Sequence, residues 1–296
     1  MLACLSTPWG VRPSHIERYM NAISTAEMYL QDFHQRQVGV TPAAFAHLPA
    51  HAASATYASS YEVLTSLVPA VDTPLTVLDL ACGDGHLLGL LAARRQPRLQ
   101  LLGVDMSQGE LAAARAALPP SVRLLHGRGQ ALDLPSASVD YLVSHMALML
   151  MDDIEQVVRE MRRVLRSDGR FAAIVGRTFL LGEVNDVFMR VFKPIASTEL
   201  PPLRFGDRRT GSEAGWRELL DGAFADVEFD DIDVPWTPTP GELWTALLDT
   251  YDIDRLDDGA RQRLRGAFLD AVAPLQGGDG KIATGWGLRL VRARAA

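Results

Sequence analysis

Apolar and polar residues alternate in blocks along the middle of the chain. Short apolar runs, typical of strands buried on both faces, occupy residues 75–80, 99–105, 122–126, 139–144 and 170–175. The periodicity between these runs predicts helices over 86–95, 107–117 and 153–166. Strands and helices that alternate in this way form a parallel sheet with helices on both faces. The pattern therefore predicts an α/β fold.

The segments on either side of this block follow other patterns. Residues 14–34 and 57–67 are expected to be helical, with a loop near 40–42 and another at 48–49. We therefore expect an N-terminal helical lid or cap over residues 1–70, which either packs on the main domain or covers a ligand. The main domain is expected over 71–296, with an irregular insertion at 178–210, a helix at 212–222, a strand at 226–234, extra helices within 240–273 and a last strand at 286–291.

Composition and charge narrow the class of protein. The chain has 296 residues, of which 48% are hydrophobic and 22% charged, as in ordinary globular proteins. Its net charge of −7 argues against a nucleic-acid partner held through phosphate contacts. Cys4 and Cys82 are too few for a disulfide framework or a cysteine zinc site. Without a membrane-spanning or signal-like run, we expect a cytoplasmic protein with no membrane partner. Its oligomeric state stays open.

The stretch TVLDLACGDGHL, residues 76–87, carries the clearest chemical signal. A buried strand ends in a turn with two glycines, Gly83 and Gly85, and a helix follows from His86. This arrangement lets a nucleotide-like ligand approach the backbone. A dinucleotide fingerprint would need a small residue where Leu88 stands, so an oxidoreductase function is disfavoured. Asp105, at the end of the second strand, is a carboxylate that can accept both hydrogen bonds of a ribose diol.

Several motifs together resemble one family. The sequence DLACGDG at 79–85 resembles the first motif of class I S-adenosylmethionine-dependent methyltransferases, and LGVDMS at 102–107 resembles the second. Residues 129–131 resemble the segment beside the adenine, and 138–141 the fourth-strand motif. Residues 160–170 are similar to the family's E-x-x-R-V-L-x-P-G-G segment, with Ser-Asp-Gly in place of Pro-Gly-Gly. The resemblance covers about 75–176, in family order.

The resemblance implies a seven-stranded Rossmann-like sheet of order 3-2-1-4-5-7-6, with the last strand antiparallel. S-Adenosylmethionine would lie across the carboxyl ends of strands 1, 2 and 4. Gly83 and Gly85 would admit its amino-acid end, with Asp79 near its amino group and Asp105 on its ribose. The other implied cofactor-binding residues are Met106 and Ala131 on the two faces of the adenine, Gln130 on its edge where the family usually has an acid, and Ala81, Ser144 and Tyr61.

The chemistry asks for few catalytic groups. A sulfonium already carries a good leaving group, so the protein mainly aligns the nucleophile with the methyl carbon, and a base is needed only if the acceptor holds its proton. His145, just after the fourth strand, is the candidate base, although a histidine there could equally bond the backbone or line the cofactor pocket. No metal is expected. Candidate substrate-lining residues are Tyr19, Tyr29, His34, Arg177 and Phe179.

These expectations lead to three hypotheses about function. The first is methyl transfer to a small-molecule acceptor, in bacterial specialised metabolism by analogy with the family. In the second, S-adenosylmethionine is itself the substrate: it cyclises to a small-ring amino acid or gives up its aminocarboxypropyl group, and methylthioadenosine is released. The third is a non-catalytic adenosine-binding protein, which the intact glycine turn and Asp105 disfavour.

Overall fold

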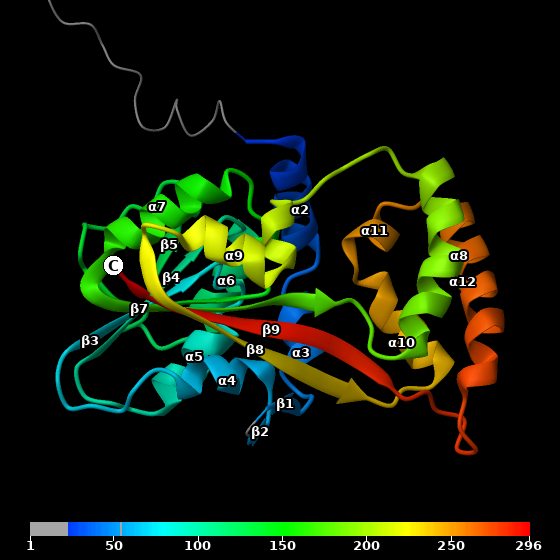
Figure 1. Ribbon diagram of the computed structural model, residues 1–296, viewed down its shortest axis with the longest axis horizontal. Coiled ribbons are helices and arrows are strands. Elements are labelled where there is room, and N and C mark those ends of the chain that lie inside the picture. The colour runs from blue at the N-terminus through cyan, green and yellow to red at the C-terminus, as the bar shows by residue number, and fades with distance from the viewer. Residues whose placement is uncertain (1–22, 54) are drawn as a thin grey trace, which may run out of the picture.

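The computed structural model describes residues 23–53 and 55–296. In this part of the chain, nine strands form one mixed sheet with helices on both faces (Figure 1). In chain order the strands are β1 (Ala50–Ala52), β2 (Ala55–Tyr57), β3 (Leu75–Leu80), β4 (Leu99–Asp105), β5 (Arg123–His126), β6 (Val139–His145), β7 (Leu165–Thr178), β8 (Phe224–Trp236) and β9 (Thr284–Ala295). Tyr19 and the start of the first predicted helix lie outside the described residues.

The strand order confirms the expected fold class. The sheet runs β2-β1-β8-β9-β7-β6-β3-β4-β5. Its seven strands from β3 to β9 follow the order 3-2-1-4-5-7-6, and β9 is antiparallel to both of its neighbours. The expectation of seven strands is corrected to nine, because a short hairpin, β1–β2, extends the sheet beyond β8. Within the expected N-terminal helical cap, residues 50–52 and 55–57 are therefore strands.

Alternating side chains of the central strands fill two cores. Every residue of β3 is buried, since helices cover both sides of the sheet. Val77 faces the core that includes Leu87, Leu88 and Leu91 of α5 (His86–Ala93). The next residue, Leu78, faces the opposite core, which includes Trp216 of α9 (Glu213–Leu220). This two-residue alternation turns the apolar run of the sequence into a strand at the centre of the molecule.

Figure 1 shows α7 and α9 over one face of the sheet and α4 and α5 over the other. A group formed by α8, α10, α11 and α12 lies beyond the carboxyl end of β7, and α2 lies between that group and the sheet. The bounds of these and the remaining helices are α2 (Thr25–Arg36), α3 (Val40–Phe45), α4 (Ser60–Ser66), α6 (Gln108–Ala117), α7 (Ile154–Val164), α8 (Glu183–Glu199), α9 (Glu213–Leu220), α10 (Pro240–Leu248), α11 (Tyr251–Asp254) and α12 (Asp258–Val272).

Two segments expected to be irregular are helical. Residues 40–45 form α3, and most of the predicted irregular insertion forms α8, a helix of 17 residues that contains Pro194. The buried side chains of α8 recur at helical spacing, at 184, 187, 188 and 192, and Phe188 meets Phe268 of α12 edge-on at 5.8 Å between ring centroids. Packing on α12 thus outweighs the helix-breaking tendency of the proline. Among the described helices, none is long and apolar enough to cross a membrane.

Candidate cofactor and active site

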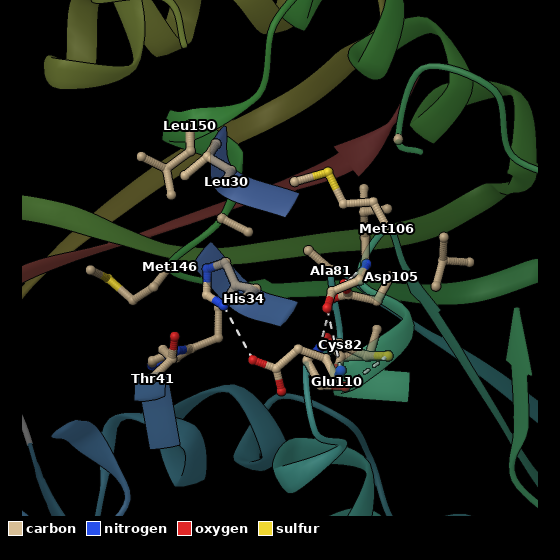
Figure 2. A pocket seen from close by; sticks show the side chains of 18 of the residues that line it. Leu30, His34, Thr41, Ala81, Cys82, Asp105, Met106, Glu110, Met146 and Leu150 are labelled. Carbon is tan, nitrogen blue, oxygen red and sulfur yellow. Dashed lines mark hydrogen bonds and ion pairs between the residues drawn. The ribbon is translucent and has the colours of Figure 1, made fainter. Parts of the chain in front are cut away.

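A cavity opens at the carboxyl ends of β3, β4 and β6, where α2 and α11 face the sheet (Figure 2). This edge is the topological switch point of the sheet, since the chain leaves β3 toward β4 on one side and later returns to β6 on the other. The space between its walls is about 1020 Å³, open solvent at the mouth included.

The glycine turn after β3 forms the floor of this cavity. Ala81 and Gly83 line it and both have positive φ, of 61° and 53°. Gly85 also has a positive φ, of 82°, and is the N-cap of α5, but it does not line the cavity. A Cβ atom at Gly85 would lie 2.5 Å from Leu118 Cδ1. Gly83 thus opens the backbone to a ligand, while Gly85 allows α5 to pack on the chain that follows α6.

Asp105 fixes the turn from the next strand. Its Oδ2 accepts from the Gly83 N–H and its Oδ1 from the Ser107 N–H, both at 2.8 Å. A carboxylate has about four acceptor positions, so two of them stay open for hydroxyl groups of a ligand. Burial raises the pKa of Asp105, and the two backbone N–H groups oppose that shift. The residue both holds the turn and faces the cavity, as Figure 2 shows.

Asp79, near the end of β3, is the most deeply buried carboxyl group of the site. It lines the cavity at 2% exposure, and none of the described residues donates a hydrogen bond to its side chain. Burial, together with the charges of Asp105 and Asp84, raises its pKa to about 8. A buried carboxylate of this kind is stabilised by a nearby cation. The site therefore fits a ligand with a positively charged end beside Asp79.

Met106 and Gln130 contribute an apolar and an amide side chain to the cavity wall. Figure 2 shows the Met106 side chain at the cavity. The amide nitrogen of Gln130 donates to Glu27 Oε1 at 2.8 Å and to the Asp152 carbonyl at 2.7 Å. Glu27, on α2, also forms a buried ion pair with Arg128. The local sequence around 128–131 does not predict the contact with Glu27, which lies about a hundred residues earlier in the chain.

His145 lies at the wall of the cavity but is deeply buried. Tyr61 stacks on its ring, with 3.9 Å between centroids, and its Nε2 lies 2.9 Å from the Ser60 hydroxyl. Burial, with the nearby His86 as a second cause, lowers its pKa to about 3. His86 also lines the cavity and is more exposed; burial lowers its pKa too.

His34 connects α2 to two other walls of the cavity. Its Nδ1 lies 3.2 Å from Glu110 Oε1 on α6, and its Nε2 lies 3.1 Å from the Tyr251 hydroxyl on α11 (Figure 2 shows the first contact). Both oxygens of Glu110 also accept from the Gly39 N–H, at 3.2 Å. The N-terminal helices are thus held against both the sheet domain and the helical group.

Other predicted site residues do not reach the cavity. Ser144 donates to the Leu80 carbonyl at 2.8 Å and joins β6 to β3, and Ala131 lines a separate hollow behind Gln130. Tyr29 bonds Asp254 at 2.7 Å in the contact between α2 and α11. Arg177 pairs with Asp233 on β8, and Phe179 packs on Phe188 and Trp286 at the surface. For these five residues, side-chain direction or a competing partner excludes contact with this cavity.

Comparison with known proteins gives a consistent result. Residues 78–173 match the family described as Methyltransferase domain. The malonyl-[acyl-carrier protein] O-methyltransferase of Methylococcus capsulatus is 37% identical over 33% of this chain and 36% of its own length. A probable S-adenosylmethionine-dependent methyltransferase of Mycolicibacterium smegmatis is 34% identical over 51% of this chain and 52% of its own.

Among solved structures, a putative type II methyltransferase from Anaeromyxobacter dehalogenans shares the fold, with a TM-score of 0.56 and 21% identity over 79% of this chain and 94% of its own. The chain spans about a third to a half of the length of the curated relatives named above. Residues 78–173 are thus similar to a methyltransferase domain, and the strand order and the glycine turn agree with that similarity.

Proposed function

We propose that the protein transfers the methyl group of S-adenosylmethionine to a small-molecule acceptor. The observation that supports this most directly is Asp79, a buried carboxyl group on the cavity wall without a donor among the described residues. Its counter-charge is then the cationic end of S-adenosylmethionine. A role in bacterial specialised metabolism is part of the proposal and rests on analogy alone.

In this proposal, different residues of the cavity contact different parts of the cofactor. Asp105 accepts from the ribose hydroxyls with the acceptor positions left by Gly83 and Ser107. Met106 packs on the adenine face and Gln130 contacts its edge, while Ala81 and Gly83 approach the methionine portion. Tyr61 offers an aromatic ring near the sulfonium. The bound cofactor supplies an activated methyl group, and the protein supplies alignment and exclusion of water.

The burial of His145 argues against its role as the general base. A histidine with a pKa near 3 holds a proton poorly at neutral pH, and His145 is already engaged with Ser60 and Tyr61. We propose that His145 instead holds the Tyr61 ring in place. His86, which is partly exposed on the same wall, is the better proton acceptor for a substrate that needs one.

The test compares Asp105→Asn with Asp140→Asn. Each aspartate accepts a backbone N–H of a neighbouring segment at 2.8 Å, from Gly83 and Thr76 respectively, but Asp140 lies at the opposite end of the sheet. Calorimetry should show S-adenosylmethionine binding at least about tenfold weaker in Asp105→Asn. Asp140→Asn should bind as the wild type does.

Turnover separates the remaining hypotheses. With a panel of small-molecule acceptors, the proposal predicts S-adenosylhomocysteine that depends on both enzyme and acceptor. Methylthioadenosine formed from S-adenosylmethionine alone, and lost in Asp105→Asn, would contradict methyl transfer and establish the cofactor as the substrate. Binding without any product across the panel would favour a non-catalytic adenosine-binding protein.

A further inference from the structure

The side chain of Gln130 is held in one orientation by the protein. The amide nitrogen has two hydrogens, and the structure gives a partner to each, Glu27 Oε1 and the Asp152 carbonyl. No described residue donates to the amide oxygen. Because Gln130 lines the cavity, its oxygen is the atom left to meet a ligand.

Glu27 makes this orientation the stable one. It lies on α2, is 4% exposed and forms an ion pair with Arg128, which is also buried. A carboxylate only accepts, so Glu27 holds the nitrogen of Gln130 and disfavours the flipped amide, which would bring two oxygens together. A hydrogen bond to a charged acceptor is also stronger than one between neutral groups.

We propose that Glu27 is a positioning residue that makes the site selective for a 6-aminopurine. Gln130 presents only an acceptor to the base, and the 6-amino group of adenine is a donor. A purine with an oxygen at position 6 would place two acceptors against each other. This inference rests on the proposed binding of S-adenosylmethionine and adds the residue that reads its base.

The experiment measures binding of two ligands that differ at the purine edge, S-adenosylhomocysteine and S-inosylhomocysteine. Calorimetry gives both dissociation constants for the full chain and its variants. The wild type should prefer the adenosine ligand by about tenfold or more. In Glu27→Gln, the amide introduced at position 27 turns its oxygen to Arg128 and its nitrogen to Gln130, so the preference should fall to about threefold or less.

Two further variants make the ratio informative. Gln130→Ala removes the reading group and should also lose the preference. Gln35→Ala is the matched control, because Gln35 is on α2 too and joins it to α6 by accepting from the Gly109 N–H at 2.8 Å. If loosening of α2 were the whole effect, the two ligands would weaken together and the ratio would stay as in the wild type. Gln35→Ala should keep that ratio.

Each outcome decides the proposal. A wild type without preference, or Glu27→Gln with the wild-type ratio, overturns it while leaving S-adenosylmethionine binding intact. Should Glu27→Gln fail to fold, a wild-type ratio in Gln130→Ala overturns it equally. No binding of S-adenosylhomocysteine to the wild type would overturn this inference together with the proposed function, and is recognised because both ligands then fail.

Discussion

At the scale of single residues, Asp79 links the site to stability. Its folded-state pKa of about 8 lies above the ordinary value of 3.8 because of burial and the charges of Asp105 and Asp84. In the absence of ligand, the folded protein therefore keeps a proton on Asp79 between about pH 4 and pH 8, and the unfolded chain does not. Stability from this proton is present at low pH and is lost as pH rises toward 8.

Asp79→Asn keeps this position neutral at every pH. The free energy of unfolding of the variant, minus that of the wild type, should increase by about 2 kcal/mol between pH 6 and pH 8. Urea unfolding without ligand, followed at several pH values, measures the difference. Groups that titrate in both proteins, such as His145, largely cancel in this comparison. A difference that stays constant over the range would show that Asp79 is ionised throughout.

The turn at Gly85 requires a glycine, and substitution at this position tests that requirement. Gly85→Ala places a side chain at φ 82° and against Leu118, so we expect a loss of about 2–4 kcal/mol in the free energy of unfolding. Gly89→Ala is the control: it lies in the same helix, and its Cβ would meet Leu118 Cδ2 at an ordinary 3.6 Å. That change should stabilise by about 0.5–1 kcal/mol. Equal effects in denaturant unfolding would refute this account of the turn.

At the scale of elements, Tyr29 lies in the contact between α2 and α11 and not in the substrate site expected for it. Its hydroxyl bonds Asp254, and burial is the main cause of the raised pKa of Tyr29. Tyr29→Phe should therefore lower the free energy of unfolding by about 1 kcal/mol and leave the affinity for S-adenosylhomocysteine unchanged. Urea unfolding and calorimetry measure the two quantities. Weakened binding comparable with that of Asp105→Asn would return Tyr29 to the ligand site.

The elements that the sequence predicts well are those whose signal is local. β3 and β4 have the predicted bounds, because a short, nearly continuous apolar run between turn residues suffices to mark a buried strand. β1 and β2 have three residues each and exist through pairing, β1 with β8 some 180 residues later. The helix α8 was hidden by its proline, although its apolar spacing was regular. Distant partners, and not local propensity, fix these segments.

The same distinction explains the site. The motif residues Asp79, Gly83 and Asp105 occupy consecutive strand ends, so their meeting at one edge of the sheet follows from the fold. Glu27 and His34 come from α2, whose position depends on packing against both the sheet and α11. The exclusion of Ser144, which lies on β6, depends on side-chain direction, and a shift of one residue along a strand reverses that direction. Long-range packing therefore decides the part of the site that sequence patterns miss.

At the scale of the whole molecule, charge favours one form of the cofactor. The chain carries a net charge of −7, and the acidic residues that line the cavity are Glu27, Asp79, Asp84, Asp105 and Glu110. Arg128 pairs with the first of them. S-Adenosylmethionine has one positive charge more than S-adenosylhomocysteine. The negative field of the protein and cavity should therefore attract the substrate form more than the product form.

The dependence of binding on salt concentration distinguishes the long-range field of the protein from short-range contacts with the ligand. Raising the ionic strength from about 0.02 M to about 0.5 M shortens the range of electrostatic interactions and should reduce the preference for S-adenosylmethionine over S-adenosylhomocysteine by about two- to fivefold. Calorimetric dissociation constants for both ligands at each salt concentration give this ratio. Shared contacts to adenine, ribose and carboxylate cancel in it. A ratio independent of salt would mean that short-range contacts alone distinguish the sulfonium charge. The net charge of the molecule would then play no part in the preference for S-adenosylmethionine.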